Sequence, residues 1–251
     1  MRYSIKVKIT SQNGWRLNTK THMATRKDRA SAQTTESALS KVYLKDTQAK
    51  YVETILKNQI TFCHGPAGTS KTFSAMYAAL KLYKEKKIKK IILTKPIQEA
   101  GEKLGFLPGT IDEKIAPYIK SFTSNIEKIV GFTEAHNIMG RGVIEFQPLA
   151  YMRGDTFDDA IMILDEAQNA DYKQLMLFIT RMGNDSKVVI AGDVSQYDIE
   201  KSKVSLPAFI DLMKDVKGVG VHTFGDEDIV RAEILQEIVR RYEKWKYDNN
   251  K

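Results

Sequence analysis

The feature that most constrains this chain is a glycine-rich segment set between an apolar run and a helix-forming run. Residues 65–72 read Gly-Pro-Ala-Gly-Thr-Ser-Lys-Thr, between the apolar residues 60–63 and the helix-forming residues 73–80. A strand, a glycine-rich turn and a helix in this order are typical of a P-loop, because the backbone N–H groups of the turn and the helix N-terminus face one anion. The segment therefore predicts a phosphate-binding loop.

Each position of this loop is expected to contact a nucleotide. Lys71 should reach the β- and γ-phosphates, and the Thr72 hydroxyl should be a ligand of Mg²⁺. Ser70 stands where the pattern has its second glycine, and its Cβ is unfavourable wherever the backbone needs a positive φ. The alternative is an ordinary glycine-rich loop. The predicted nucleotide-binding residues of the loop are Gly65, Pro66, Ala67, Gly68, Thr69, Ser70, Lys71 and Thr72.

Positive charge is concentrated in two parts of the chain. The formal net charge is +8, and residues 1–40 hold eight Lys and Arg against Asp28 and Glu36. Residues 81–90 hold six lysines and a single acidic residue, Glu85. Basic patches of this kind indicate nucleic-acid binding, although a solvated helix end explains the second cluster equally well.

The composition indicates a globular protein without a membrane segment. Hydrophobic residues make up 42% of the 251 positions, enough for a sizeable core. No apolar run approaches the roughly 18 residues of a membrane span, and the first residues lack the apolar core of a signal peptide, so we expect a cytoplasmic location. The lone Cys63 excludes an internal disulfide, and we expect it to be a small buried residue.

The chain is expected to divide into an N-terminal extension, residues 1–40, and one domain, residues 41–251. Alternating polar and apolar residues predict a short strand in residues 1–9. Residues 11–40 are polar and basic without an apolar period, which is typical of a flexible arm. We expect residues 1–22 to be appended or non-essential.

Within the domain, strand-like apolar runs alternate with helical patterns. This alternation predicts an α/β fold in which a parallel sheet lies between helices and binds ligands at the carboxyl ends of its strands. Strands are expected at residues 60–63, 90–94, 143–146, 160–164, 187–191 and 219–223. The expected helices are one that starts at an N-cap on Asp46 or Thr47, one after the P-loop, and those at 111–130, 171–181 and 226–246.

Two further segments carry predictions of their own. Residues 99–110 hold three glycines and a proline, so we expect an irregular loop. The last helix, 226–246, should be amphipathic and bury one apolar face. That face consists of Ile234, Leu235, Ile238, Val239 and Tyr242.

Several polar residues follow the predicted strands and fit the needs of ATP hydrolysis. Asp165, directly after residues 160–164, is expected to hold Mg²⁺, and Glu166 to act as a general base toward water. Gln196 could orient water or sense the γ-phosphate, and Gln48 could offer its amide to adenine. The structural alternatives are helix capping for Asp165 and Glu166, a turn residue for Gln196 and an exposed helix residue for Gln48.

Five segments together resemble the PhoH family of P-loop ATPases, over roughly residues 42–246. They are residues 65–72, residues 99–109, Tyr151-Met152-Arg153-Gly154, Leu164-Asp165-Glu166-Ala167-Gln168-Asn169 and Gly192-Asp193-Val194-Ser195-Gln196. A chain with this domain alone is similar to the PhoH-like proteins of bacteriophages, whose location would be the host cytoplasm. The resemblance implies a P-loop NTPase with a RecA-like parallel sheet, similar to the first RecA-like domain of superfamily 1 helicases.

The resemblance also implies roles for individual segments. Residues 165–168 would be the Walker-B motif, and residues 192–196 would couple the nucleotide to nucleic acid. Gln48 takes the position that reads adenine, and Lys95 follows a strand whose end faces nucleic acid. Lys95 stands where relatives usually have Arg, which keeps the charge but loses the planar fork.

Such a helicase closes its ATP site with a second domain, for which this chain has no residues left. Phosphoryl transfer without an arginine finger is slower by about 10³–10⁵. We therefore expect a neighbouring subunit to supply the finger within a ring, most simply a hexamer. The candidates are Arg153, Arg181 and Arg231, each of which could instead be a surface ion-pair partner.

The function expected from the sequence is an ATPase that uses ATP and Mg²⁺ to act on nucleic acid, RNA rather than DNA, with RNA helicase activity as one form. One alternative is an ATP-binding regulatory or nucleic-acid-binding module with weak turnover. Another is a small-molecule kinase, which the motif at residues 192–196 disfavours because a kinase does not need it.

Overall fold

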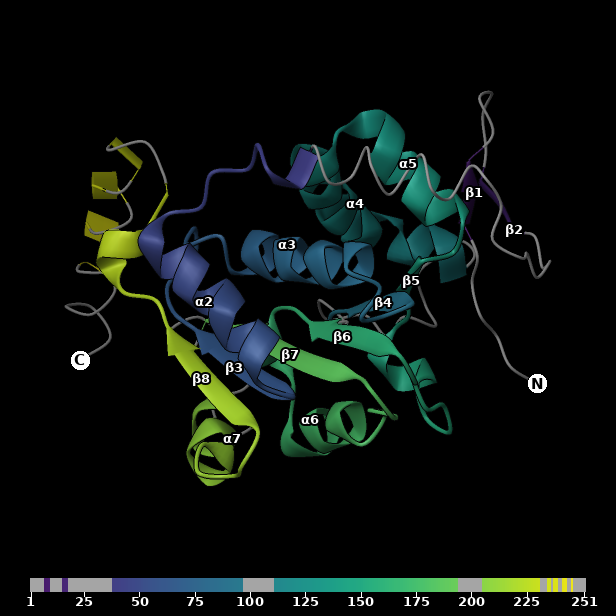
Figure 1. Ribbon diagram of the computed structural model, residues 1–251. Coiled ribbons are helices and arrows are strands. Elements are labelled where there is room, and N and C mark those ends of the chain that lie inside the picture. Colours follow the sequence, from purple (N-terminus) through teal and green to yellow (C-terminus); the bar gives the residue numbers. More distant parts are fainter. Residues whose placement is uncertain are drawn as a thin grey trace.

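A six-stranded, fully parallel β-sheet forms the centre of the molecule, with the strand order β5-β4-β6-β7-β3-β8 (Figure 1). The computed structural model describes residues 7–9, 15–17, 38–96, 111–193 and 205–230, together with residues 234, 235, 237, 238, 241, 242 and 245. For residues 7–9, 15–17 and 111–118 it describes the backbone alone. The strands are β3 Ile60–His64, β4 Lys90–Thr94, β5 Ile144–Phe146, β6 Ala160–Leu164, β7 Lys187–Gly192 and β8 Val219–Thr223. All six predicted strands are confirmed, with ends that differ by at most one residue.

The central strand β6 explains why the sheet is covered on both sides. All five of its residues are buried. Because successive strand residues point to opposite faces, Ile161 and Ile163 enter one apolar cluster and Met162 enters the other. A strand that is apolar throughout is therefore stable only between two layers of helices.

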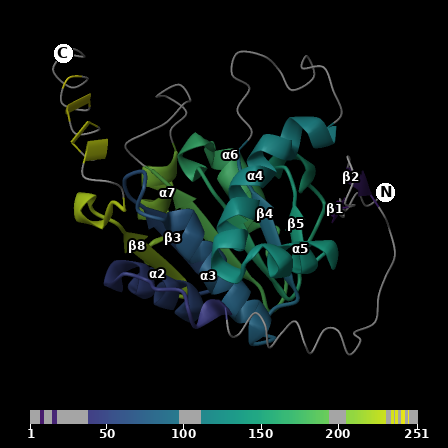
Figure 2. The same cartoon turned by 90° about the horizontal axis from the view of Figure 1, so that it is seen from above.

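The helices form these two layers. On one face lie α2 Asp46–Lys57, α3 Lys71–Lys84, α4 Ile111–Val130 and α5 Phe132–Gly140. Figure 2 looks onto this face and shows the four helices spread across the sheet. The opposite face is covered by α6 Tyr172–Ile179 and α7 Leu206–Met213. The predicted parallel sheet between helices is confirmed, and within the described residues no helix is long and apolar enough to cross a membrane.

The sequence patterns gave no prediction for α5 and α7, which have nine and eight residues. Helices this short are marginal by their own propensity and depend on tertiary packing. In α7, Leu206 and Phe209 pack beneath the sheet, and in α5, Ala135 and Ile138 join the core on the other face. Neither packing surface can be recognised in an isolated segment of sequence.

Two predicted helix starts were correct or nearly so. Helix α6 begins after the N-cap Asp171, whose Oδ1 accepts the backbone N–H of Gln174 at 2.8 Å. The N-cap of α2 is Lys45, whereas Asp46 or Thr47 was predicted. The shift has a physical reason, because the Gln48 side chain accepts the backbone N–H of Lys45 and so closes the first turn one residue earlier.

The prediction for the last helix was wrong in two respects. Residues Asp226–Asp228 form a short 3₁₀ turn, and Ile229 is extended, so the predicted α-helix does not start at residue 226. Further on, the helical residues Ile234 and Ile238 are exposed, at 70% and 55%. Leu235 and Tyr242 are exposed as well, and Val239 lies outside the described residues. An apolar period indicates a face that can be buried, but it does not say what covers it.

At the N-terminus, β1 Val7–Ile9 confirms the predicted short strand. It pairs antiparallel with β2 Trp15–Leu17, a strand within the segment for which a flexible arm was predicted. The rest of residues 1–37 lies outside the described part of the chain, as does the loop predicted at residues 99–110.

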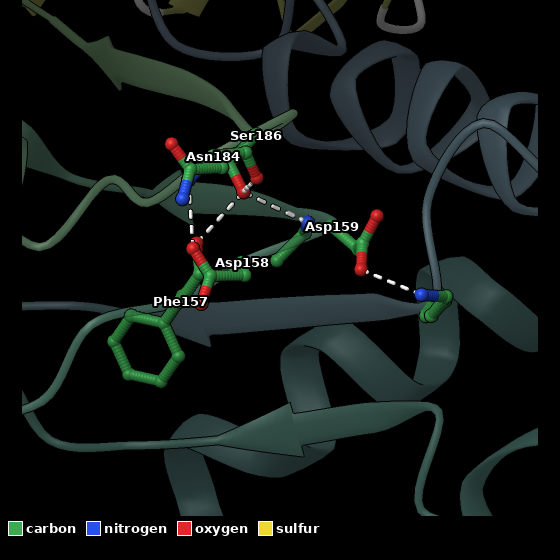
Figure 3. Close-up of polar contacts among 7 residues, drawn as sticks. Phe157, Asp158, Asp159, Asn184 and Ser186 are labelled. Atoms are coloured by element: carbon green, nitrogen blue, oxygen red, sulfur yellow. Dashed lines mark hydrogen bonds and ion pairs between the residues drawn. The ribbon is translucent and has the colours of Figure 1, made fainter.

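At the amino ends of β6 and β7, two turns are tied together by polar contacts (Figure 3). Ser186 Oγ donates to the carbonyl of Phe157 at 2.7 Å and accepts the backbone N–H of Ala160 at 3.0 Å. Asp158 Oδ1 accepts the backbone N–H of Asn184 at 2.7 Å. These contacts are local and lie at the edge of the sheet opposite the P-loop, so their role is to hold the fold.

Candidate nucleotide-binding site

The glycine-rich loop leaves β3 at the carboxyl edge of the sheet and leads into α3. Gly65 has a φ of +150°, and a Cβ there would lie 2.6 Å from the carbonyl oxygen of Phe224, so only glycine fits. Gly68 has a φ of 89° and Ser70 one of 65°, both in the left-handed region. The positive φ suspected at the serine position is therefore present. For a non-glycine residue this conformation costs about 1–2 kcal/mol.

The Lys71 side chain folds back over this loop. Its Nζ donates to the carbonyls of Gly65 and Pro66 at 2.7 and 2.9 Å. Thr69 Oγ1 donates to the same Pro66 carbonyl at 3.0 Å, so that the loop is braced from within. The ammonium thus lies inside the loop, beside the first turn of α3, whose backbone N–H groups have no partners within the helix.

Asp165, the first residue after β6, faces the start of α3. Its Oδ1 accepts the Thr72 hydroxyl at 2.9 Å, and its Oδ2 lies 3.0 Å from the ammonium of Lys95, at the end of the neighbouring strand β4. Hydroxyl and carboxylate oxygens are the ligands that Mg²⁺ prefers. The structure therefore brings together the two residues predicted to hold the metal.

Glu166 follows in a left-handed conformation, with a φ of 55°. Its Oε2 accepts a hydrogen bond from Nε2 of the buried Gln168 at 2.8 Å, and Oε1 of Gln168 accepts the backbone N–H of Asp193 at 2.9 Å. Gln168 therefore links the carboxylate after β6 to the backbone after β7. The alternative of helix capping does not hold for the side chains of Asp165 and Glu166: Glu166 occupies the N-cap position of a 3₁₀ turn, Ala167–Asn169, without a side-chain hydrogen bond to it, and Asp171 is the N-cap of α6.

These groups line one cavity of about 730 Å³, a size typical of small-molecule sites. Its walls include Ala67, Gly68, Ser70, Lys71 and Thr72 from the loop, together with Asp165 and Glu166. Gly65, Pro66 and Thr69 shape and brace the loop. Tyr43, Asn125 and Lys128 also line the cavity, although the sequence patterns did not single them out.

Gln48 lies in the wall of the same cavity and is buried, at 7% exposed. The alternative of an exposed helix residue is therefore wrong. Its Oε1 accepts the Lys45 N–H at 3.0 Å, which fixes the orientation of the amide. The predicted contact with adenine stays a prediction, now with a side chain held beside the P-loop.

The segment after β8 is attached directly to the P-loop. The backbone N–H of Phe224 donates to the His64 carbonyl, and that of Val230 donates to the Gly68 carbonyl, both at 2.9 Å. Val230 also lines the cavity. Long-range backbone contacts of this kind carry no signal in the sequence.

The remaining predicted residues stand apart from this group. Arg181 lies near the amino end of β7, where its Nη1 donates to the Asp155 carbonyl at 3.0 Å, and Arg153 is in an exposed turn before β6. Among the described residues, the lining of the nucleotide cavity includes neither arginine. Gln196 and Arg231 lie outside the described residues, so their predicted roles are untested.

Ionisable groups next to the loop are held neutral. Burial, together with the nearby Lys71 ammonium, lowers the pKa of His64 below its ordinary value. Burial raises the pKa of the Cys63 thiol above its ordinary value, and Cys63 is fully buried as predicted. Within the described residues, no cluster of three or more His, Cys, Asp or Glu side chains could hold a metal ion.

Solved structures match this chain only at low similarity. The UvsW helicase from bacteriophage T4 is 14% identical, with a TM-score of 0.40, over 81% of this chain and 69% of that one. A Sulfolobus solfataricus SWI2/SNF2 ATPase core solved with dsDNA is 15% identical, with a TM-score of 0.42, over 61% and 32% of the two chains.

Proteins related in sequence match this chain at much higher identity than these structures do. PhoH-like proteins of Bacillus subtilis and Mycobacterium tuberculosis are each 43% identical to this chain, over 78% and 79% of its length. Protein PhoH of Escherichia coli is 36% identical over 78%. These alignments span 62%, 56% and 56% of the respective relatives, so the chain matches little more than half of each. The family model for PhoH-like protein matches residues 42–243, and the chain therefore belongs to the PhoH-like family, with a P-loop NTPase fold.

Proposed function

We propose that this protein is an Mg²⁺-dependent ATPase that acts on RNA as a ring of identical subunits, most simply a hexamer. The observation that carries the ATPase proposal is the hydrogen bond between Thr72 and Asp165, in one cavity with Lys71. It places a hydroxyl and a carboxylate beside an ammonium at the N-terminus of a helix. That combination suits a phosphate chain and its metal ion.

In this proposal Lys71 changes partners when a nucleotide binds. Its ammonium leaves the carbonyls of Gly65 and Pro66 and compensates the charge of the β- and γ-phosphates, while the first N–H groups of α3 bind the same oxygens. Thr72 and Asp165 would hold Mg²⁺, which supplies further positive charge to the phosphates when it is bound.

Glu166 is the proposed general base. Its side chain is half-exposed, at 51%, so a water molecule can reach it. The hydrogen bond from Gln168 restricts the rotation of the carboxylate and leaves one oxygen to accept a proton from water. Gln168 also binds the backbone N–H of Asp193, so a movement of Asp193 would change the position of the Glu166 carboxylate.

The ring and the RNA substrate rest on different arguments. Efficient phosphoryl transfer calls for an additional cation, and a subunit interface could supply it through Arg153, Arg181 or Arg231. The net charge of +8 favours a polyanionic partner. In the basic cluster at residues 81–90, Lys89 pairs with Asp159 and Lys90 with Glu145, so we assign no RNA contact to these two lysines.

A second candidate is a nucleotide-binding module with weak turnover. The observation that favours it is the strained Ser70 backbone together with an ammonium already bound by its own loop. In that case ATP would bind, but replacing Glu166 would leave the slow hydrolysis unchanged. A small-molecule kinase is disfavoured, because it has no need of the Gln168–Asp193 connection.

The deciding experiment is the steady-state ATPase rate with and without single-stranded RNA, at modest salt, for the wild type and Lys71→Ala. We expect stimulation by RNA that exceeds stimulation by DNA of the same sequence, and loss of both in the variant. Light scattering on the same samples should give the mass of a ring. A monomer with full activity would contradict the ring, and a rate indifferent to RNA would favour the binding module.

A further inference from the structure

The ammonium group of Lys95 lies next to Asp165, one of the two predicted metal ligands. Lys95 places its Nζ 3.0 Å from Oδ2 of Asp165 and 4.0 Å from Oε1 of Glu166. The Lys95 and Asp165 side chains are only 13% and 6% exposed, so solvent screens this pair poorly. The resemblance to the PhoH family related Lys95 to nucleic acid, and the sequence did not predict this contact.

The two oxygens of Asp165 are divided between a neutral and a charged partner. Oδ1 accepts the Thr72 hydroxyl, and Oδ2 faces the Lys95 ammonium. A buried carboxylate without such a partner would be strongly unfavourable. An Mg²⁺ ion held by Thr72 and Asp165 would bring two more positive charges within a few ångströms of the ammonium, and like charges at that distance repel.

We propose that Lys95 is a placeholder cation for the magnesium site. Its ammonium compensates Asp165 and Glu166 while no Mg²⁺ is bound, and Mg²⁺ competes with it for their negative charge. Lys95 is thus a positioning residue that sets the magnesium concentration at which the site fills. This inference rests on the proposed nucleotide-binding function and adds a regulator to it.

The surroundings of Lys95 allow such an exchange. Its ammonium also lies 5.2 Å from the centre of the Phe122 ring in α4, within reach of a cation–π interaction. A lysine stem is flexible, so the ammonium can move away from Asp165 and keep a favourable contact with the ring. The electrostatic cost of binding Mg²⁺ is then reduced but not removed.

The competition has a reciprocal consequence. Any polyanion that attracts the Lys95 ammonium away from Asp165 will tighten Mg²⁺ binding, and Mg²⁺ will tighten polyanion binding by the same factor. Lys95 would in this way connect the nucleotide site to RNA without a large movement of the backbone.

The test is a titration of Mg²⁺ at a fixed concentration of fluorescent N-methylanthraniloyl-ADP, read as bound nucleotide and not as turnover. Lys95→Met keeps an apolar side chain of similar length but removes the charge, and it should need at least about five-fold less Mg²⁺ for half-maximal binding. Lys95→Gln, which can still donate a hydrogen bond, should shift in the same direction. Lys95→Arg should remain close to the wild type.

A matched control is Lys89→Met, which breaks an ion pair of 2.7 Å with Asp159 at the opposite edge of the sheet. It should leave the magnesium midpoint unchanged. The proposal is overturned if the two neutral Lys95 variants fold and need as much Mg²⁺ as the wild type, or more.

Melting curves without nucleotide give a second readout. Millimolar Mg²⁺ alone should raise the Tm of Lys95→Met and Lys95→Gln more than that of the wild type. An equal rise in all three proteins overturns the placeholder role. Failure of the wild type to bind the fluorescent nucleotide would instead refute the proposed function, and the melting comparison would still decide the role of Lys95.

Discussion

The two edges of the central sheet use polar residues in opposite ways. At the amino edge, Ser186 and Asp158 satisfy backbone groups of adjacent turns (Figure 3). At the carboxyl edge, Lys71 and Asp165 make contacts that a nucleotide and its metal would replace. Polar side chains of similar types can thus hold a fold or bind a ligand, depending on whether their partners are permanent.

The largest expected effect is at the carboxyl edge, in Glu166→Gln. This change removes the proposed base but keeps the size and one oxygen of the side chain, so kcat should fall by about 10²–10⁴ while ATP affinity is retained. Rapid-quench measurement of hydrolysis beside equilibrium binding would separate the two. Unchanged hydrolysis would favour the weak-turnover module.

A matched pair of glycines sharpens the comparison between the edges. In Gly192→Ala, the new methyl group would meet Oε1 of Gln168 and a methyl of Leu206, both within 3 Å. Displacing Gln168 disturbs Glu166, and misplacements of about 1 Å can cost a factor of 10² in rate, so we expect a ten- to hundred-fold loss of ATPase activity.

In Gly183→Ala, the methyl group would instead meet Asp158 and the carbonyl of Phe157 at the amino edge. We expect a loss of about 1–3 kcal/mol in the free energy of unfolding, with the activity per folded molecule unchanged. Urea unfolding and ATPase assays on both variants provide the test. Equal effects on activity would break the proposed division between the edges.

Ser186→Ala should have an effect of similar size to that of Gly183→Ala, also confined to stability. The Ala160 N–H is buried and loses its acceptor, so the free energy of unfolding should fall by about 1–3 kcal/mol. Ser186→Thr keeps the hydroxyl and serves as the control. A change in the KM for ATP at constant stability would show that the amino edge influences the site.

The smallest expected effect is that of Ser70→Gly. Glycine relieves the left-handed strain but gains freedom in the unfolded chain, so the unfolding free energy should rise by less than about 1 kcal/mol. Thermal melting checks this, with Ser70→Ala, which retains the strain, as the comparison. A lower Tm for the glycine variant than for the alanine variant would contradict the strain argument.

The features that could be predicted from the sequence are those that depend on residues close together in the chain. The P-loop, the position of Asp165 after an apolar strand and all six strands of the sheet follow from local patterns. The Lys95–Asp165 pair could not be predicted, because that contact depends on β4 lying beside β6, and no single segment of sequence specifies the strand order. The same holds for Gln168 and Asp193, which meet because β6 adjoins β7.

The exposed apolar residues near the C-terminus are the opposite case. Their spacing correctly indicates a helix, and residues such as Ile234 and Ile238 are helical, but they are open to solvent in the single chain. Burial depends on a surface elsewhere, and no periodicity in the helix itself specifies that surface.

The hydrogen bond from Val230 to Gly68 has a mechanical consequence. It joins the polypeptide that leads to these exposed residues to the middle of the phosphate-binding loop. A displacement of Val230 would therefore move the Gly68 carbonyl, and with it the loop that we propose binds phosphate.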